Sequence, residues 1–211
     1  MRPQAFLFDM DGLLVDSEPV WHRAELAVVA RWGGAWTAED QAYCTGRGIP
    51  ETARRMAERA GRVFDAARDP AILVDAFLEL RDSVALTRGA LEAIAFAERV
   101  GKLAVASSSP RRVVEAVLAA HDLLHRFHAV ITGDDVARVK PEPDIFLLAA
   151  ERVAADPAAC VVLEDSPAGV LAGKRAGMRV VAVPTPEMRA RISGADHVVG
   201  DLHEAVALFE V

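Results

Sequence analysis

Two aspartates follow a short apolar stretch near the start of the chain. Residues 6–8 are apolar, and Asp9 and Asp11 come next, separated by one residue. In extended backbone, side chains two positions apart lie on the same face, so we expect the two carboxylates close together. Neighbouring like charges raise each other's pKa or bind a cation, and an all-oxygen cluster suits Mg²⁺. The alternative is that both merely cap the following turn, but a buried strand seldom ends in two uncompensated acids.

A second acidic pair has the same setting later in the chain. Apolar residues 161–163 lead into Glu164 and Asp165, followed by Ser166 as a predicted helix N-cap and Pro167 as the first helical residue. If this segment is a strand beside the first, four acids share one crevice. Alternatively, Asp165 belongs to the helix cap and Glu164 is solvated. These residues alone leave both interpretations open.

A serine run and one lysine could supply an anion-binding site. Ser107, Ser108 and Ser109 precede Pro110, so hydroxyls and the free N–H groups of a helix start could bind an anion, with Ser109 as the N-cap. A plain loop is the alternative. Lys140 is one of three lysines in an arginine-rich chain and is followed by proline. We therefore expect Lys140 to be a compact charge that is held in place. The alternative, a surface lysine in a turn, is less favoured.

The elements that must position these residues follow one pattern from about residue 87 onward. Short apolar runs alternate with amphipathic stretches, which is typical of a parallel sheet whose strands are connected by helices. The predicted strands are residues 5–9, 103–106, 129–131, 160–163 and 180–183. The predicted helices are residues 90–100, 110–121, 143–153, 167–176 and 202–209, with left-handed C-terminal caps at Gly101 and Gly177.

Residues 16–86 differ from the rest of the chain. They contain helical patterns over residues 20–31, 52–61 and 71–80 and no convincing strand. We therefore predict an α/β fold with a βαβ core of residues 1–15 and 87–211 and an inserted helical cap of residues 16–86. Ligands of open α/β sheets bind at the carboxyl ends of the strands, where the acids and serines are predicted.

Composition limits the function classes. The 211 residues include 24 Lys+Arg and 31 Asp+Glu, a net charge of −7, and 52% are hydrophobic. No uncharged run is long enough to cross a bilayer, and the apolar start over residues 5–8 is too short for a signal peptide, so we expect a cytoplasmic protein with no membrane partner. The acidic balance disfavours nucleic acid and favours a small phosphorylated metabolite. Cys44 and Cys160 are expected as buried thiols, and the small size suggests a monomer.

Four motifs in order resemble those of the haloacid dehalogenase superfamily. They are Asp9-Met10-Asp11-Gly12, Ser107, Lys140 and Glu164-Asp165. Further runs resemble the branch that contains β-phosphoglucomutase and sugar-phosphate phosphatases such as the 2-deoxyglucose-6-phosphate and hexitol phosphatases. These runs are Asp16-Ser17-Glu18-Pro19, Ala-Ser-Ser-Ser-Pro, Lys-Pro-Glu-Pro-Asp-Ile-Phe and Leu-Glu-Asp-Ser-Pro-Ala-Gly. The resemblance implies a Rossmann-like core and a cap that opens about hinges near residues 14–18 and 86–89.

The resemblance also implies how the core motifs act. Asp9 would be the nucleophile that forms an aspartyl phosphate, and Asp11 would be the general acid and base. Ser107, the Ser108 backbone and Lys140 would bind the phosphoryl oxygens. The implied activity is hydrolysis of a small phosphomonoester, with sugar and polyol phosphates favoured.

The same resemblance implies Mg²⁺ as the cofactor. The carboxylates of Asp9 and Asp165 and the backbone carbonyl of Asp11 would hold the ion, with Glu164 in support. In the cap, Arg47 lies between two glycines, in an expected turn between helices, and is the candidate specificity contact.

Other functions compete with a phosphatase. Dehalogenases proper lack the second aspartate of the first motif, so Asp11 favours phosphoryl chemistry. Mutases of this branch keep a histidine and a lysine in the cap. This cap contains no lysine, and by counting Trp21 rather than His22 takes the histidine position. A β-phosphoglucomutase-type mutase therefore stays the alternative, while phosphoacceptor receivers are shorter and have no helical insert.

Several other residues are expected to be structural. Cap packing, rather than a sugar platform, is expected for Trp21, Trp32 and Trp36. A solvated helix end, rather than a metal site, is expected for His121, His125 and His128, because the glutamate of an H-E-x-x-H motif is missing. Arg111 and Arg112 open a helix, where solvation is expected and contact with substrate is the alternative.

Overall fold

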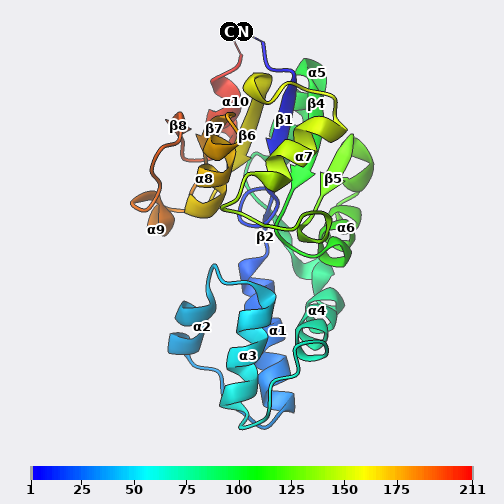
Figure 1. Cartoon of the computed structure of the whole chain (residues 1–211), viewed down its shortest axis with the longest axis vertical. Helices are drawn as coiled ribbons and strands as arrows, with labels where there is room; N and C mark the ends of the chain where they lie inside the picture. Colours follow the sequence, from blue (N-terminus) through cyan, green and yellow to red (C-terminus); the bar gives the residue numbers. More distant parts are fainter. Residues whose placement is uncertain (1, 211) are drawn as a thin grey trace. The chain divides into compact units, whose positions relative to one another are not determined.

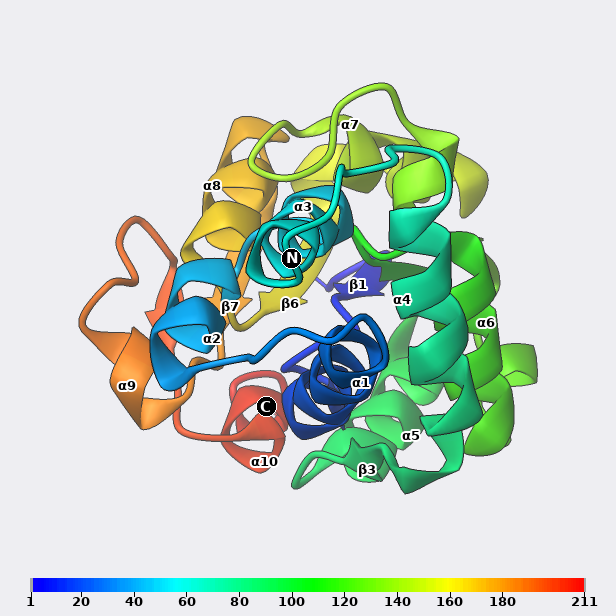
Figure 2. The ribbon, with the colours of Figure 1, turned by 90° about the horizontal axis from the view of Figure 1, so that it is seen from below.

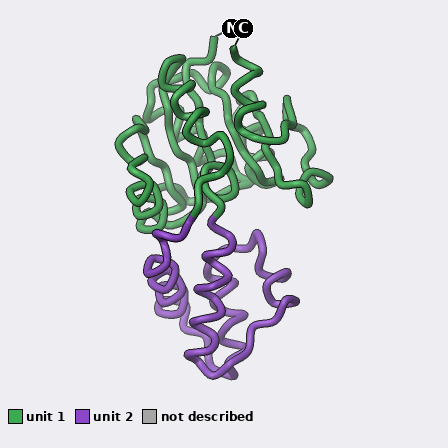
Figure 3. Tube along the Cα trace, turned by 180° about the vertical axis from the view of Figure 1, so that it is seen from behind, with its two compact units in different colours: residues 1–16, 85–211 green, residues 17–84 purple. Residues whose placement is uncertain are grey.

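The structure is a computed structural model that describes residues 2–210. These residues form two compact units (Figure 3). Unit 1 comprises residues 2–16 and 85–210, and unit 2 comprises residues 17–84. Among the described residues, no helix has the length and apolar character needed to cross a membrane.

Unit 1 is built on a six-stranded parallel sheet in the order β5-β4-β1-β6-β7-β8 (Figure 1). Its strands are β1 (Ala5–Phe8), β4 (Lys102–Ala106), β5 (Ala129–Ile131), β6 (Cys160–Glu164), β7 (Arg179–Ala182) and β8 (His197–Val198). Five of them lie within one residue of the predicted limits at each end. Strand β8 was not predicted, because its two residues are exposed and belong to no apolar run.

Helices cover both faces of this sheet (Figure 2). They are α5 (Ala90–Val100), α6 (Arg111–Ala120), α7 (Asp144–Arg152), α8 (Pro167–Arg175), α9 (Pro186–Arg189) and α10 (Leu202–Ala207). Helices α7 and α8 lie on one face, and α5, α6 and α10 lie on the other (Figures 1 and 2). The single-turn helix α9 was not predicted, whereas the other five lie within two residues of the predicted limits.

The buried strand β1 supplies side chains to both layers of the core. Leu7 packs with Phe146 of α7 in one apolar cluster. On the other face, the ring of Phe6 makes edge contacts with Phe96 and Phe209, with centroids 6.1 and 5.3 Å apart. The alternation follows from the two-residue repeat of a strand, and it explains why this strand is apolar throughout.

The two predicted glycine caps have different outcomes. Gly177 follows α8 with φ of 74°, the left-handed conformation predicted for it. The prediction for Gly101 is wrong, because its φ is −163°, which is extended. The chain there passes directly from α5 into β4, so no left-handed turn is needed.

A short antiparallel ribbon links the segments of unit 1 that lead into unit 2. Strand β2 (Val15–Asp16) pairs with β3 (Ala85–Leu86), with Asp16 opposite Ala85. The ribbon continues through a hydrogen bond from the Thr87 backbone N–H to the Leu14 carbonyl, 3.0 Å long. Two-residue strands carry no periodic signal, and neither was predicted.

Unit 2 contains four α-helices, which are α1 (Glu18–Arg31), α2 (Ala38–Cys44), α3 (Ile49–Arg59) and α4 (Asp69–Glu79). Helix α2 was not predicted, because its seven residues are too few to show a clear helical period. Asp40 of α2 is completely buried and accepts hydrogen bonds from Arg55 and Arg59 of α3, at 2.8 and 2.6 Å. Trp21 stacks on Phe77 of α4, with ring centroids 4.0 Å apart, which supports the packing interpretation of this tryptophan.

Candidate active site

The polar residues of the sequence motifs lie at the carboxyl ends of three adjacent strands. The register places Phe8 opposite both Val105 and Leu163. The strand ends that follow carry Asp9, Ser107 and Glu164. All three side chains belong to buried residues, 6%, 1% and 1% exposed respectively. The parallel sheet therefore brings together motifs that are far apart in the sequence.

Lys140 lies between two of the buried carboxylates. Its Nζ donates hydrogen bonds to Asp9 and to Glu164 Oε1, the latter 2.5 Å away, and its side chain is only 6% exposed. Burial alone would lower the pKa of this amine, but the two carboxylates outweigh burial and raise it. Nζ also lies 4.9 Å from the ring centroid of Phe146. The alternative of a surface lysine is wrong.

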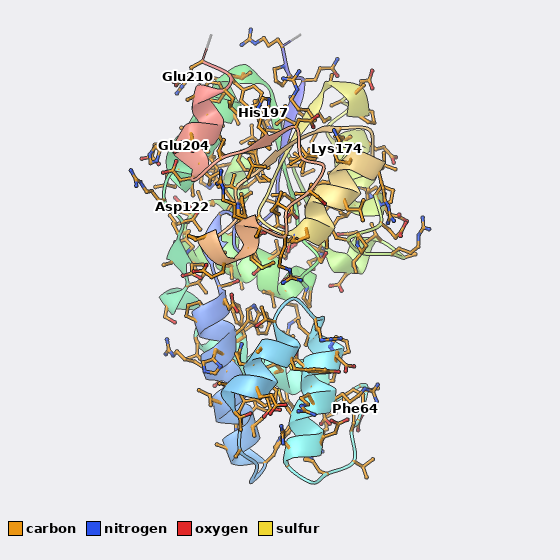
Figure 4. The ribbon with its side chains drawn as sticks, turned by 90° about the vertical axis from the view of Figure 1, so that its left-hand side faces the viewer. Phe64, Asp122, Lys174, His197, Glu204 and Glu210 are labelled. Atoms are coloured by element: carbon orange, nitrogen blue, oxygen red, sulfur yellow. The ribbon has the colours of Figure 1, made fainter. Side chains whose placement is uncertain are left out.

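The other two lysines have ordinary surroundings. Lys174 of α8 pairs with Asp196 at 2.7 Å on the surface of unit 1 (Figure 4), and Lys102 is exposed at the start of β4. Lys140 is thus set apart by its position, as its sequence context suggested.

Glu164 is buried and accepts hydrogen bonds from both Lys140 and Ser166, so it is not the solvated side chain of the alternative interpretation. One carboxylate oxygen accepts from Lys140, and the other accepts from the Ser166 backbone N–H and hydroxyl, at 2.8 and 2.9 Å. Ser166 also caps α8 as predicted, because its hydroxyl accepts from the Gly169 N–H at 3.0 Å. A Cβ atom at Gly169 would lie 1.8 Å from Glu164 Oε1, so only glycine leaves room for this carboxylate.

Three carboxylates form a cluster suited to a divalent cation. One oxygen from each of Asp9, Glu164 and Asp165 lies within 4.8 Å of the others. Burial, followed by repulsion from Glu164 and other neighbouring carboxylates, raises the pKa of Asp9 despite Lys140, and also that of Asp165. A hard divalent cation would relieve this repulsion, so the donor set fits Mg²⁺. Gly12, at φ of 83°, makes room for Asp165, because a Cβ there would lie 2.3 Å from Asp165 Oδ2.

Two serine hydroxyls hold the side chain of Asp11. Its Oδ2 accepts from Ser109 Oγ at 2.8 Å and from Ser107 Oγ at 3.2 Å. Ser107 Oγ in turn accepts from the Ser109 backbone N–H at 3.1 Å. Ser108, between them, is exposed. The serine run is therefore an ordered part of the site and not a plain loop.

The prediction that Ser109 caps the next helix is wrong. Helix α6 begins at Arg111, with Pro110 in the N-cap position. The carboxylate of Asp134 accepts from the Arg111 backbone N–H at 2.9 Å and satisfies that helix end instead. The Arg111 guanidinium pairs with Asp135 at 2.6 Å and with Glu115 at 2.8 Å. This arginine is therefore engaged in surface ion pairs of unit 1.

Arg47 lies in unit 2, in the turn between α2 and α3. Its Nε donates to the Tyr43 carbonyl at 2.7 Å, and its guanidinium stacks over the Tyr43 ring, 4.3 Å from the centroid. The predicted turn is present, and its arginine is exposed. In the same unit, Arg62 stacks on Trp32 at 4.1 Å, and Trp36 donates to Gln41 at 3.0 Å. Both tryptophans thus have contacts within the unit.

Several functional neighbours could not be assigned from the sequence. Ser109 was given a capping role, although a second hydroxyl two residues after Ser107 was a usable signal for a shared partner. The ring of Phe146 beneath Lys140 and the close approach of Gly169 to Glu164 depend on how α7 and α8 pack. Within residues 2–210, the cluster of metal-ligating side chains includes none of the three histidines near residue 125.

The strand order of the parallel sheet reverses between β1 and β6, and the cluster of acids lies at the strand ends there. These features define a Rossmann-like α/β enzyme with an inserted helical unit. The family model for haloacid dehalogenase-like hydrolases matches residues 3–177, and the chain belongs to that family.

Relatives of known structure or name cover nearly the whole chain. It is 35% identical to hexitol phosphatase B of Escherichia coli (strain K12) over 219 residues, which span 96% of this chain and 94% of the relative. CbbY of Rhodobacter sphaeroides, solved in complex with phosphate, is 30% identical with a TM-score of 0.82 over 96% of both chains. A Thermotoga maritima structure provisionally assigned as a β-phosphoglucomutase is 28% identical, with a TM-score of 0.81 over 98% of both chains.

Proposed function

We propose that this protein is a Mg²⁺-dependent phosphatase that hydrolyses a small phosphomonoester, with sugar and polyol phosphates as the substrate class. The observation that carries the proposal is the buried Asp9 carboxylate, bonded to Lys140 and adjacent to Asp165 at the carboxyl edge of the sheet. Membership of the hydrolase family and the likeness to a hexitol phosphatase support it.

The reaction divides into two displacements at phosphorus. An oxygen of Asp9 attacks the phosphorus, the bond to the alcohol oxygen breaks, and Asp11 gives its proton to that oxygen. A water molecule then attacks the phosphorus of the aspartyl phosphate. Asp11 takes a proton from the water, and the bond to Asp9 breaks. Phosphate is released and both carboxyl groups return to their starting states.

The remaining motif residues position the phosphoryl group and balance its charge. The Ser107 hydroxyl, the Ser108 backbone N–H and Lys140 bind its oxygens. Asp9, Asp165 and the Asp11 carbonyl would hold Mg²⁺, with Glu164 in support, and the bound ion would neutralise charge between carboxylate and phosphate. Arg47 is proposed as a substrate contact from unit 2, where its guanidinium is exposed.

The test is phosphate release from a panel of sugar, polyol, nucleotide and pseudouridine phosphates, with Mg²⁺ or with a chelator. Asp9→Asn should abolish nearly all turnover and leave the fold intact, because the amide has no comparable nucleophilicity. Asp122→Asn, at an exposed turn, is the matched control and should behave like the parent protein. Substantial metal-dependent release by Asp9→Asn would reject the assignment.

A phosphosugar mutase is the second candidate, because the Thermotoga maritima structure has that assignment. The panel therefore includes β-glucose 1-phosphate with product analysis. Free phosphate and glucose support the phosphatase. Conversion to glucose 6-phosphate with little free phosphate would show a mutase, and would mean that a cap without lysine does not prevent mutase chemistry.

A further inference from the structure

The Asp11 carboxylate has one oxygen shared by two hydroxyl donors. Oδ2 accepts from Ser109 at 2.8 Å and from Ser107 at 3.2 Å. Donors on Oδ2 stabilise that oxygen as the unprotonated one. A proton carried by this carboxyl group therefore belongs on Oδ1.

The loop that presents these hydroxyls is fixed to the neighbouring strand. The Ser107 backbone N–H donates to the Ile131 carbonyl at 3.0 Å, and the Gly133 N–H donates to the Ser109 carbonyl at 3.1 Å. The Ser107 hydroxyl is also held, because it accepts from the Ser109 N–H. Both serines are thus anchored on either side of Ser108, so the two hydroxyl positions are defined by the backbone.

The two serines cannot keep the same role once a phosphoryl group binds. A serine hydroxyl has one proton to donate. If Ser107 donates to a phosphoryl oxygen, as proposed above, it no longer donates to Asp11. The shorter bond from Ser109 is unaffected by that exchange, because Ser109 is not needed for the phosphoryl oxygens.

We propose that Ser109 is a positioning residue that holds the Asp11 carboxyl group in place for proton transfer while Ser107 is bound to phosphate. This inference rests on the proposed phosphatase function. Ser109 acts through Asp11 and does not itself contact the reacting atoms. Asp11 becomes a charged carboxylate as it gives up its proton, and hydrogen bonds to charged groups are among the stronger ones in proteins, so loss of this one should affect proton transfer measurably.

The leaving group distinguishes this role from a merely structural one. An alkyl phosphate such as glucitol 6-phosphate needs a proton on its departing oxygen, whereas p-nitrophenyl phosphate has a stable phenolate as leaving group and does not. The ratio kcat/KM reports the steps through the first displacement. Ser109→Ala should lower kcat/KM for the alkyl phosphate by about ten- to a hundredfold, and for the aryl phosphate by less than about threefold.

Three further variants complete the experiment. Ser109→Thr, which keeps a hydroxyl, should recover most of the alkyl phosphate activity. Asp11→Asn should show the same dependence on leaving group, and adding Ser109→Ala to it should cause no further loss. Ser193→Ala makes the same substitution at an exposed site of unit 1 and should behave like the parent protein.

Each result has a defined meaning. Equal losses for both substrates, a rise in KM with kcat unchanged, no change in Ser109→Ala, or an additive loss in the double variant would overturn the positioning role. If the parent protein hydrolyses neither substrate nor any member of the panel, the proposed function itself fails. The two failures are therefore distinguishable.

Discussion

Lys140 supplies one positive charge to a site that contains three nearby carboxylates. Asp9 and Glu164 share its ammonium group, and Asp165 lies within the same cluster. Burial raises the pKa of both Asp9 and Asp165. Repulsion among the carboxylates, which one ammonium group does not balance, raises both pKa values further. Stability should therefore respond to a divalent cation and to the removal of one carboxylate.

The Asp165→Asn variant tests this imbalance without measuring turnover. In the presence of a chelator, and above pH 9 where Asp165 with its raised pKa of about 9 is ionised, the substitution should raise the unfolding temperature by a few degrees, because it removes repulsion. Saturating Mg²⁺ should stabilise the parent protein by about 2–3 kcal/mol at a hundred times Kd and the variant by much less. Thermal unfolding with chelator or Mg²⁺ measures both effects, with Asp122→Asn as control. A variant that keeps the full Mg²⁺ response would exclude Asp165 as a ligand.

Glu25 in α1 is one of the buried acids of unit 2. It is 6% exposed, and its Oε2 has no hydrogen-bond partner among the described residues. The nearest basic group is His22, with Nδ1 at 3.8 Å from that oxygen. Burial raises the pKa of Glu25 from its ordinary value of 4.5 to about 7, although His22 opposes the shift.

The stability of the protein should therefore fall as pH rises from 4.5 through 7. A folded-state pKa above the unfolded value means that the folded protein binds more protons in this interval, so deprotonation favours unfolding. Relative to Glu25→Gln, the parent should lose up to about 3 kcal/mol across the interval, at about 1.4 kcal/mol per pKa unit. Urea unfolding of both proteins at pH 4.5 and pH 8 gives this difference. A constant difference between the two proteins would contradict the raised pKa.

Residue-scale chemistry was predictable where the signal was local. Four site residues each follow or lie near an apolar run, namely Asp9, Ser107, Lys140 and Glu164. The register of β1 with β4 and β6 brings the strand ends of this site side by side. For Ser109, the spacing of two residues from Ser107 was a usable signal of a shared partner, but its contact with Asp11 also depends on a loop conformation fixed by hydrogen bonds to residues 131 and 133.

At the scale of the element, α8 connects helix packing to the site. Its first turn is capped by Ser166, and Gly169 in the same turn lies against the Glu164 carboxylate. A side chain at position 169 has no space without moving Glu164, and Glu164 in turn bonds to Lys140. The position of this helix is thus linked to the charges of the site.

Gly169→Ala should reduce phosphatase activity at least tenfold and lower stability by about 1–3 kcal/mol through overpacking. The matched control is Gly177→Ala, at the end of the same helix, where a Cβ meets nothing within 4 Å but φ is 74°. The control should lose only about 1 kcal/mol from backbone strain and keep its activity. Steady-state kinetics and urea unfolding report the two effects. Equal activity in both variants would show that Glu164 tolerates displacement.

The elements that were predicted well are those whose pattern is strong over several residues. Strands β1, β4 and β6 are apolar because both faces of the sheet are covered. Helix α2 and strand β8 were missed because the first is only seven residues long and the second is two exposed residues long. Tertiary contacts, such as those of Asp40 in α2, stabilise elements of this kind, and a single sequence does not display them.

At the scale of the whole molecule, each unit has its own interior. The interior of unit 2 includes the buried Asp40, which accepts hydrogen bonds from Thr37, Arg55 and Arg59. Burial alone would raise the pKa of Asp40, but these donors outweigh it and lower the pKa to about 2. The stabilisation is therefore present above pH 3.8, and it is lost as pH falls through about 2.

Asp40→Asn should destabilise unit 2 selectively at pH 7. The free energy of unfolding should fall by about 2–3 kcal/mol, which corresponds to a pKa shift of about two units. Arg55 and Arg59 would then donate to a neutral amide oxygen, which is a weaker acceptor than the carboxylate. Hydrogen exchange should accelerate for amides in residues 17–84 and change little in strands β1, β4 and β6. Equal acceleration throughout the chain would show that the two units unfold together.

The ribbon of β2 and β3 is the point at which unit 2 is inserted into unit 1. Asp16 and Ala85 are hydrogen-bonded neighbours, so the 68 residues between them leave and re-enter unit 1 at a single point. In topological terms, unit 2 is an elaborate hairpin loop, and a tight two-residue turn could close the same ribbon. Such a point accepts insertions of any length without altering strand order. Helical modules could therefore be exchanged there while the sheet of unit 1 stays unchanged.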